Sequence, residues 1–373
     1  MSTETVEFTE IDNYFDLFTA DTPLIDVRAP VEFSQGAFPL ASNLPLMSDE
    51  DRHLIGICYK NHGQQRAIEL GKQLVSGDIK SDRINSWAKF TTTHPQGALY
   101  CFRGGLRSKI TQQWIYEKTN IIYPRIKGGY KALRQFLLEQ LTVCAEAITP
   151  VIIGGRTGVG KTLLLYQLQK QIDLEKILGH RGSAFGKHVY PQPGQIDVEN
   201  TLAISLLKFF NAKIKNIALE DEAANIGSRQ IPKALFMRMQ QSPLILLEAS
   251  IEERVNNVFN EYVTQALNEY CTALGIIEGT NAWIHNLNNA LDKIKRRLGG
   301  VRFKALQAQV EQAIKQQQLH RDNSHHKLWI ETLLVDYYDP MYDYQISKKE
   351  QRIVFRGKQQ TVLTLLNAQY NIQ

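Results

Sequence analysis

An apolar segment that runs directly into a glycine-rich motif constrains the fold of this chain more than any other feature. Residues 150–153 are typical of a buried strand, and residues 155–162 follow the pattern G-x-x-x-x-G-K-T. A helix-compatible run over residues 163–171 comes next. A strand, a glycine-rich turn and a helix in this order form the phosphate-binding unit of parallel sheets, so the sequence predicts an α/β fold.

This motif supplies the groups that a bound phosphate needs. Its glycines let backbone N–H groups approach an anion, Lys161 adds a positive charge, and the hydroxyl of Thr162 is suited to Mg²⁺. The loop leaves open which phosphorylated ligand it holds, a nucleotide or another diphosphate. The predicted ligand residues are Gly155, Thr157, Gly158, Gly160, Lys161 and Thr162.

A second apolar run, residues 215–222, ends in carboxylates. In P-loop proteins an acid at such a strand end orients Mg²⁺ or a water. Asp221 is the first choice to share a magnesium ion with Thr162, and Glu220 is the second, because alternate strand positions face opposite ways. The same acids are also compatible with an acidic cluster at a helix start.

A cysteine follows another apolar run and precedes a glycine pair. Residues 97–101 predict a strand that ends at Cys101, and Arg103 and Arg107 flank Gly104 and Gly105 in the next turn. Inward-pointing N–H groups and the two arginines would stabilise negative charge on the sulfur. The pattern predicts that Cys101, Arg103, Gly104, Gly105 and Arg107 form a catalytic loop. A buried structural cysteine at a strand end is the simpler alternative.

Strands and helices alternate on both sides of a predicted boundary near residues 142–150, which favours two α/β domains, 1–142 and 148–373. In the first, a parallel sheet includes strands at 23–28 and 97–101. The predicted helices of the first domain cover residues 64–75, 108–118 and 131–141. In the second, a further strand is predicted at 243–248, a mainly helical part at 251–318 and a last strand at 352–355.

Composition and charge limit the class of protein. The chain has 373 residues, 43% of them hydrophobic, and no apolar run long enough for a membrane span. Residues 1–20 are acidic, unlike a signal peptide, so we expect a cytoplasmic protein without membrane association. The four cysteines form no C-x-x-C pair, which argues against a zinc site or a disulfide framework.

Positive charge is unevenly distributed. Residues 51–150 carry fifteen Lys and Arg against seven Asp and Glu, and a second basic cluster includes Arg296 and Arg297. Such clusters can bind a polyanion, and nucleic acid is a reasonable partner. A solvated helix face explains the same charges without a ligand.

The first domain resembles a rhodanese domain. The resemblance covers roughly residues 10–140 and rests on Asp26-Val27-Arg28, Glu32-Phe33, Gly36, Ala41, Asn43-Leu44-Pro45 and the Cys101 loop. It implies a cysteine that carries sulfur or selenium as a persulfide-type adduct. Arg107 lies six positions after Cys101, one more than is usual in rhodaneses. That spacing matches cysteine phosphatases, but these have a histidine where this chain has Tyr100.

Over essentially its whole length the chain resembles tRNA 2-selenouridine synthases. The segments that carry this resemblance are 58–65, 101–105, 180–186, 219–222 and 338–342. The family implies S-geranylation of 2-thiouridine at wobble position 34 of tRNA by geranyl diphosphate, then exchange of the S-geranyl group for selenium from selenophosphate. It also implies tRNA, held by its anticodon arm, as the partner, with a selenophosphate supplier as a further candidate and Mg²⁺ as an aid to diphosphate departure.

The resemblance also supports further substrate-binding residues. Alone, each is compatible with a solvated turn or with a structural role. They are Tyr59, Lys60, Gln64, His180, Arg181 and Ser183.

Three other functions fit parts of the pattern. An ATP-dependent rhodanese-type sulfurtransferase acting on RNA would use both loops and would turn over nucleotide. A cysteine phosphatase fused to a kinase is disfavoured by Tyr100. An RNA-binding protein without catalysis would tolerate loss of Cys101.

Overall fold

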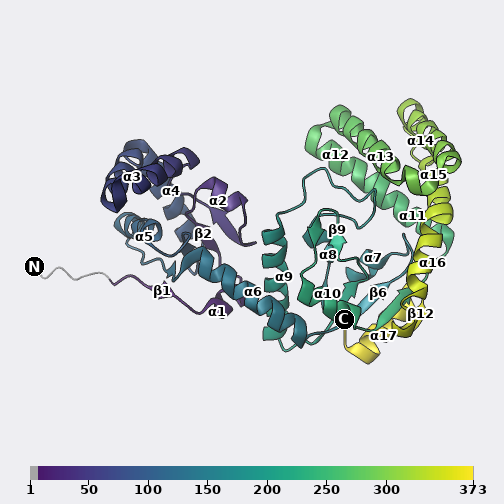
Figure 1. The fold of residues 1–373 in the computed structure, drawn as a ribbon, viewed down its shortest axis with the longest axis horizontal. Coiled ribbons are helices and arrows are strands. Elements are labelled where there is room, and N and C mark those ends of the chain that lie inside the picture. The colour runs from purple at the N-terminus through teal and green to yellow at the C-terminus, as the bar shows by residue number, and fades with distance from the viewer. Residues whose placement is uncertain (1–6, 373) are drawn as a thin grey trace, which may run out of the picture. The chain divides into compact units, whose positions relative to one another are not determined.

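The computed structural model describes residues 7–372, and its contacts divide the chain into two compact units. Unit 1 comprises the chain up to Cys144 together with Gly194–Ala212, and unit 2 comprises Ala145–Pro193 and Lys213–Gln373. Residues 1–6, which the predicted first domain includes, lie outside the described residues. Both units are built on parallel sheets with helices, which confirms the predicted α/β class (Figure 1).

Unit 1 has a five-stranded parallel sheet in the order β1-β5-β4-β2-β3. Its strands are β1 (Glu10–Ile11), β2 (Leu24–Asp26), β3 (Ala41–Asn43), β4 (Ala98–Tyr100) and β5 (Arg125–Ile126). Its helices are α1 (Tyr14–Thr19), α2 (Pro30–Ser34), α3 (Asp49–Leu74), α4 (Gly77–Thr93), α5 (Leu106–Thr119), α6 (Gly129–Ala147, which runs on into the first residues of unit 2) and α9 (Gln195–Asn211).

The core of unit 1 forms where apolar strands meet the helices. Every residue of β2 and β4 is buried, as expected for central strands covered on both faces. Trp87 of α4 packs into this core and donates its indole N–H to the carbonyl of Leu44. The buried carboxylate of Asp26 is paired with Arg28, whose guanidinium also donates to the carbonyl of Gly36. This pair therefore ties the turn after β2 to the loop before β3.

Unit 2 has a second five-stranded parallel sheet, in the order β12-β11-β6-β8-β7. Its strands are β6 (Thr149–Gly154), β7 (Gln171–Ile172), β8 (Asn216–Glu220), β11 (Leu244–Leu247) and β12 (Ile353–Gly357). The short strands β9 (Asn225–Ile226) and β10 (Arg229–Gln230) pair separately. The helices that lie between or after these strands in the sequence include α7 (Lys161–Leu165), α8 (Leu174–Leu178), α10 (Lys233–Gln240), α11 (Ile251–Phe259) and α17 (Gln359–Tyr370).

The remainder of unit 2 is helical, as the sequence predicts. Its members are α12 (Ala266–Leu274), α13 (Ile276–Leu298), α14 (Gly300–His320), α15 (His326–Leu333) and α16 (Asp339–Ser347), with π-helical turns at Asn260–Gln265 and Leu334–Tyr338. Trp283 and Trp329 are almost fully buried at its centre. Within residues 7–372, no helix combines the length and the apolar character that crossing a bilayer requires.

One helix prediction is wrong. The run 163–171 is not a continuous helix, because α7 ends at Leu165 and the chain turns to form β7. Leu164, Leu165 and Leu168 all pack into a core shared with β6, β8 and β11, and Gln171 and Ile172 pair with β8. Tertiary packing and strand pairing therefore override the local helix propensity.

Two observations bear on the predicted domain boundary. Helix α6 continues to Ala147, through most of residues 142–150. Helix α9, although it follows the glycine-rich motif in sequence, belongs to unit 1. There Asp197 accepts the N–H of Ala37, and the Asn200 side chain donates to the carbonyl of the same residue.

Candidate functional site

The glycine-rich loop after β6 has a backbone that other residues cannot adopt without strain. Gly155, Gly158 and Gly160 have φ angles of 138°, 81° and 87°. A Cβ on Gly155 would lie 2.6 Å from the carbonyl oxygen of Leu247, and one on Gly158 would lie 2.7 Å from that of Arg254. The loop therefore needs glycine for its conformation and for close packing against β11 and α11.

Helix α11 holds this loop from outside. Arg254, 3% exposed, donates from Nε to the carbonyl of Thr157 at 2.9 Å, and Asn257 donates to that of Gly158 at 2.8 Å. The guanidinium of Arg254 also binds the carboxylate of Asp339, with a distance of 3.0 Å from Nη1 to Oδ2. A buried, doubly engaged arginine thus fixes the position of the loop.

Helix α16 brings Asp339, Tyr342 and Asp343 to the same loop. Arg156 pairs with Asp343 at 2.7 Å and lies 3.6 Å from Asp339. The ring centroid of Tyr342 is 5.9 Å from Nζ of Lys161. The loop is therefore supported by residues from the far end of the chain, although no local pattern connects them.

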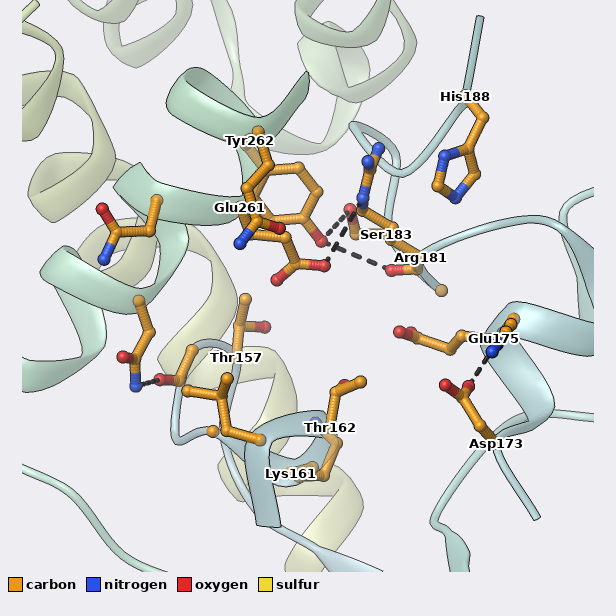
Figure 2. Close-up of a pocket in the computed structure, with 18 of the residues that line it drawn as sticks. Thr157, Lys161, Thr162, Asp173, Glu175, Arg181, Ser183, His188, Glu261 and Tyr262 are labelled. Atoms are coloured by element: carbon orange, nitrogen blue, oxygen red, sulfur yellow. Dashed lines mark hydrogen bonds and ion pairs between the residues drawn. The ribbon is translucent and has the colours of Figure 1, made fainter. Parts of the chain in front are cut away.

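A cavity of about 620 Å³ opens beside the loop, and we call it the P-loop cavity. Lys161 and Thr162 lie on one side of it and a polar wall lies opposite (Figure 2). On the wall, Ser183 donates to the hydroxyl of Tyr262 at 2.9 Å. The other wall residues that Figure 2 labels are Arg181, His188 and Glu261.

Glu269 organises part of this wall. It accepts hydrogen bonds from Arg181 at 2.8 Å and from the backbone N–H of Val189, and it lies 3.0 Å from Nδ1 of His188. Burial opposes ionisation of Glu269, but these partners lower its pKa. The carboxylate therefore orients the imidazole of His188 at the edge of the cavity.

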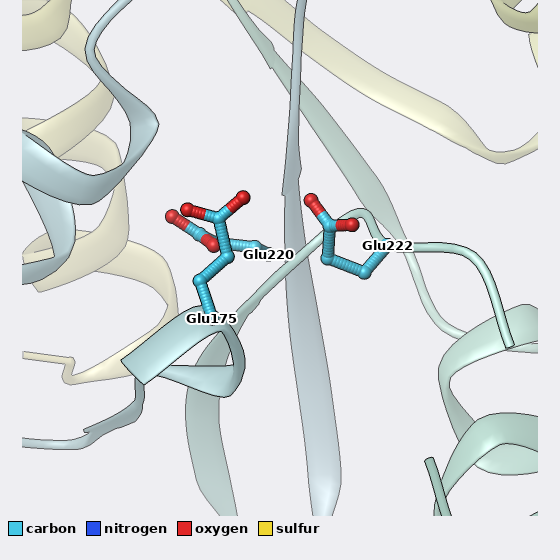
Figure 3. Close-up of side chains that lie close together, drawn as sticks. All are labelled: Glu175, Glu220 and Glu222. Atoms are coloured by element: carbon cyan, nitrogen blue, oxygen red, sulfur yellow. The ribbon is translucent and has the colours of Figure 1, made fainter. Parts of the chain in front are cut away.

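Three carboxylates gather next to Lys161 and Thr162. Thr162 donates to Oε1 of Glu220 at 2.8 Å, and oxygens of Glu175, Glu220 and Glu222 lie within 4.8 Å of one another (Figure 3). The other oxygen of Glu220 is buried and has no hydrogen-bond partner among the described residues. Three acids and a hydroxyl at this spacing are oxygen ligands of the kind that Mg²⁺ prefers.

The crowding of these acids changes how they titrate. Burial, together with the charges of Glu220 and Glu222, raises the pKa of Glu175 to about 10. Burial raises the pKa of Glu220 to about 8 despite the nearby ammonium of Lys161. Burial alone would lower the pKa of Lys161, but the attraction of Tyr342 and of the carboxylates outweighs it and raises that pKa.

The two strand-end acids named from the sequence lie in different surroundings. Glu220 contacts Thr162, whereas Asp221 forms an ion pair with Lys349 at 2.7 Å. They are adjacent in the chain and face opposite ways. The geometry therefore favours Glu220, the second choice, over Asp221 as the acid that could share a cation with Thr162.

The other residues named for unit 2 divide similarly. Arg181 and Ser183 line the P-loop cavity. His180 is not among its lining residues, and burial together with His188 lowers its pKa to about 4. Arg296 and Arg297 are exposed near the end of α13, and they line neither the P-loop cavity nor the cavity of unit 1.

In unit 1, Cys101 lies directly after β4 and is only 3% exposed. Its Sγ lies 3.3 Å from Oγ of Ser108, at the start of α5. The loop packs tightly against the start of α6, where a Cβ on Gly129 would collide with the carbonyl oxygen of Cys101 and the nitrogen of Gly104. Backbone packing against Gly129 therefore fixes the positions of both Cys101 and Gly104.

The two arginines of this loop differ in their surroundings. Arg107 is bound to Glu32 through two hydrogen bonds of 2.6 and 3.1 Å. Burial opposes ionisation of Glu32, but Arg107 lowers its pKa. Arg103 is exposed, with its guanidinium 5.8 Å from the ring centroid of Phe102. Arg103 is therefore the more accessible cation beside Cys101.

A second cavity, of about 1310 Å³, lies within unit 1, and we call it the unit 1 cavity. It brings residues of α3 together with the loop after Cys101. The residues named from the sequence that line it are Tyr59, Lys60, Gln64, Arg103 and Arg107.

Comparison with known proteins gives a consistent result. A family model described as "tRNA 2-selenouridine synthase AAA domain" matches residues 148–372. A protein named tRNA 2-selenouridine synthase from Marinobacter nauticus is 50% identical, with 93% of this chain and 95% of that protein covered. Proteins of the same name from Cupriavidus pinatubonensis and Pseudomonas fluorescens are 49% and 48% identical, over 93% and 96% of this chain and 94% and 97% of theirs.

The sequence alone did not point to several residues around the P-loop. Arg254, Glu175, Glu269 and His188 lie in segments without a recognisable motif. Asp339 and Tyr342 lie in a segment that carries the family resemblance. The resemblance indicates that these residues matter for function, but it does not indicate which other residues they contact. Their proximity to Lys161 is a consequence of the fold.

The acid cluster predicts a pH-dependent stability. Between the ordinary carboxyl pKa and about 10, the unfolded chain is ionised while folded Glu175 keeps its proton, so stability falls as pH rises through this window. Glu175→Gln should flatten the decrease in melting temperature between pH 6 and 9, measured with a chelator present. Glu252→Gln, at an exposed position of α11, is the control. An equally steep decrease of melting temperature in both variants would contradict a raised pKa of Glu175 in the folded protein.

Proposed function

The chain belongs to the tRNA 2-selenouridine synthase family and is a tRNA-modifying enzyme, and from this premise we propose that its two units perform two successive reactions on one wobble uridine. Unit 2 would transfer a geranyl group from geranyl diphosphate to 2-thiouridine. Unit 1 would exchange the S-geranyl group for selenium from selenophosphate. The observation that carries this division is that each unit has its own cavity, one beside Lys161 and one beside the Cys101 loop.

Alkylation fits the P-loop cavity. The sulfur of 2-thiouridine attacks C1 of the geranyl group, so a C–S bond forms while the C–O bond breaks and diphosphate leaves with the electron pair. Negative charge grows on the diphosphate during this step. The ammonium of Lys161 and the loop N–H groups would stabilise it, because preorganised donors act most strongly where charge develops.

The donor set fits a magnesium ion at the same place. Thr162 and Glu220 would hold it, with Glu175 or Glu222 as a further ligand, and the unpartnered buried oxygen of Glu220 would gain a partner. When bound, the ion would neutralise charge on the diphosphate. Cation binding would also release the protons that the crowded carboxylates retain.

Alkylation also removes the N3 proton of the base. His188 is a candidate to accept it, because its Nδ1 lies 3.0 Å from Glu269, which leaves Nε2 as the proton acceptor. His188 lines the P-loop cavity. The same arrangement of a carboxylate and an imidazole orients the base in many hydrolases.

Selenium exchange requires no change of oxidation level. Selenium has the same oxidation level in selenophosphate and in 2-selenouridine, whereas a persulfide-type adduct on Cys101 would require an oxidant. We therefore assign Cys101 a covalent role on the base. Its thiolate attacks C2 and expels geranylthiolate, which takes up a proton. Selenium of selenophosphate then displaces Cys101 at C2, and water cleaves the Se–P bond to release phosphate.

The base can react with Cys101 only if the buried sulfur becomes accessible. Because Cys101 is 3% exposed, attack on C2 requires the loop 102–105 to shift. Exposed Arg103 is placed to bind selenophosphate or an RNA phosphate.

We propose that Arg296 and Arg297, which are exposed on α13, bind phosphates of the anticodon arm. We place the enzyme in the cytoplasm with its tRNA.

The first test separates the two steps. Lys161→Ala should reduce geranylation at least about 100-fold, because the developing charge loses its principal cation. Selenation should be restored when the RNA is supplied already geranylated. Wobble nucleosides are quantified by mass spectrometry, with exposed Lys215→Ala as the control. Failure of the rescue in a folded protein would instead favour an ATP-driven sulfurtransferase or selenium-transfer mechanism.

The second test concerns the strand-end acids. Glu220→Gln should reduce magnesium-dependent geranylation on the order of 100-fold, because the cation loses a ligand. Asp221→Asn should have a much smaller effect, since Asp221 is paired with Lys349. Initial rates are compared over a magnesium titration. The reverse ranking would contradict the assignment of Glu220.

The third test concerns the cysteine. Cys101→Ser should abolish 2-selenouridine and leave geranylation intact, because a hydroxyl at neutral pH does not replace a thiolate. The control Cys271→Ser removes a thiol from unit 2. A covalent RNA adduct, trapped by rapid denaturation without selenophosphate, should form with wild type only. Normal selenation by Cys101→Ser would exclude a catalytic cysteine.

A further inference from the structure

The unit 1 cavity has two kinds of wall. The loop after Cys101 contributes Arg103, and α3 contributes Lys60, and both side chains are exposed. Apolar side chains line much of the remainder. They are Ile55, Ile57, Ile68, Leu106, Ile110 and Trp114.

Part of this apolar wall is in contact with solvent. Ile57 of α3 and Leu106 at the start of α5 are each 45% exposed. Leaving such side chains in water is unfavourable. The same cavity is also lined by charged side chains such as Arg52, Lys72 and Arg107, so its lining suits a ligand that has both a hydrocarbon part and an anionic part. Selenophosphate is small and highly charged, so it explains the arginine but not the apolar wall.

We propose that the apolar wall of the unit 1 cavity binds the geranyl chain of the S-geranylated wobble uridine. This inference rests on the proposed function, in which C2 of that base meets Cys101. The geranyl chain is attached to C2 of the base through sulfur. It must therefore lie within its own length of Cys101 when Cys101 reacts with C2. Phe102 of the loop after Cys101 and Leu106 at the start of α5 both line the cavity, as does Ile57.

The charges of the cavity match the remainder of such a ligand. Arg103 and Lys60 offer cations to the phosphates that flank the base, while the hydrocarbon occupies the apolar wall. Binding of the chain adds apolar burial that unmodified 2-thiouridine lacks. The geranyl group thus selects the alkylated RNA for unit 1, in addition to making sulfur a better leaving group.

The test measures binding without turnover. Full-length protein is titrated into fluorescent anticodon stem-loop RNA that carries S-geranyl-2-thiouridine, S-methyl-2-thiouridine or 2-thiouridine, with no selenophosphate present. Wild type should bind the geranyl RNA at least about tenfold more tightly than the methyl RNA. The double variant Ile57→Gln, Leu106→Gln should lose this preference while binding the methyl RNA as wild type does.

The control is Ile79→Gln, which changes a 50% exposed isoleucine of α4 outside the cavity and should keep the preference. A preference that is absent in wild type, or that persists in the double variant, overturns the proposal. So does a preference that Lys161→Ala removes, because the chain would then lie in the P-loop cavity. Since the RNA is alkylated beforehand, failure of geranyl transfer itself does not affect this measurement.

Discussion

The pairing of β6 with β8 is the constraint on which the geometry of the P-loop cavity depends. Its parallel register sets Ile153 opposite Glu220, so the glycine-rich loop and the strand-end acid emerge at the same edge of the sheet. The loop then places Oγ1 of Thr162 2.8 Å from Oε1 of Glu220. Because the register determines which acid faces the loop, a slip of one residue would present Asp221 in place of Glu220.

Carboxylates outnumber ammonium groups at this edge of the sheet. The ammonium of Lys161 faces three carboxylates whose pKa values are raised by burial and by neighbouring carboxylates. A diphosphate without a cation would be repelled by these acids once they ionise, whereas a divalent cation satisfies both. The arrangement therefore favours a ligand that arrives with a metal over a bare anion.

In unit 1, the proposed reactive residue, Cys101, is held in a different way. The Cys101 loop is held by direct backbone contact with the start of α6, which requires glycine at position 129. Its second arginine is used structurally, in the pair with Glu32, and its first remains exposed. One arginine thus maintains the loop and the other is available to a ligand.

Local pattern was sufficient for much of this molecule. The parallel α/β class, the central strands, the glycine-rich loop and the cysteine loop follow from short-range signals, because burial of apolar runs and the freedom of glycine act within a few residues. Only the tertiary structure decided the rest. It ended α7 at Leu165, placed α9 in unit 1, chose Glu220 over Asp221 beside Thr162, and brought Asp339 to Arg254. Each of these depends on register or on contacts between distant segments, whose free energy exceeds local propensity and leaves no trace in the neighbouring sequence.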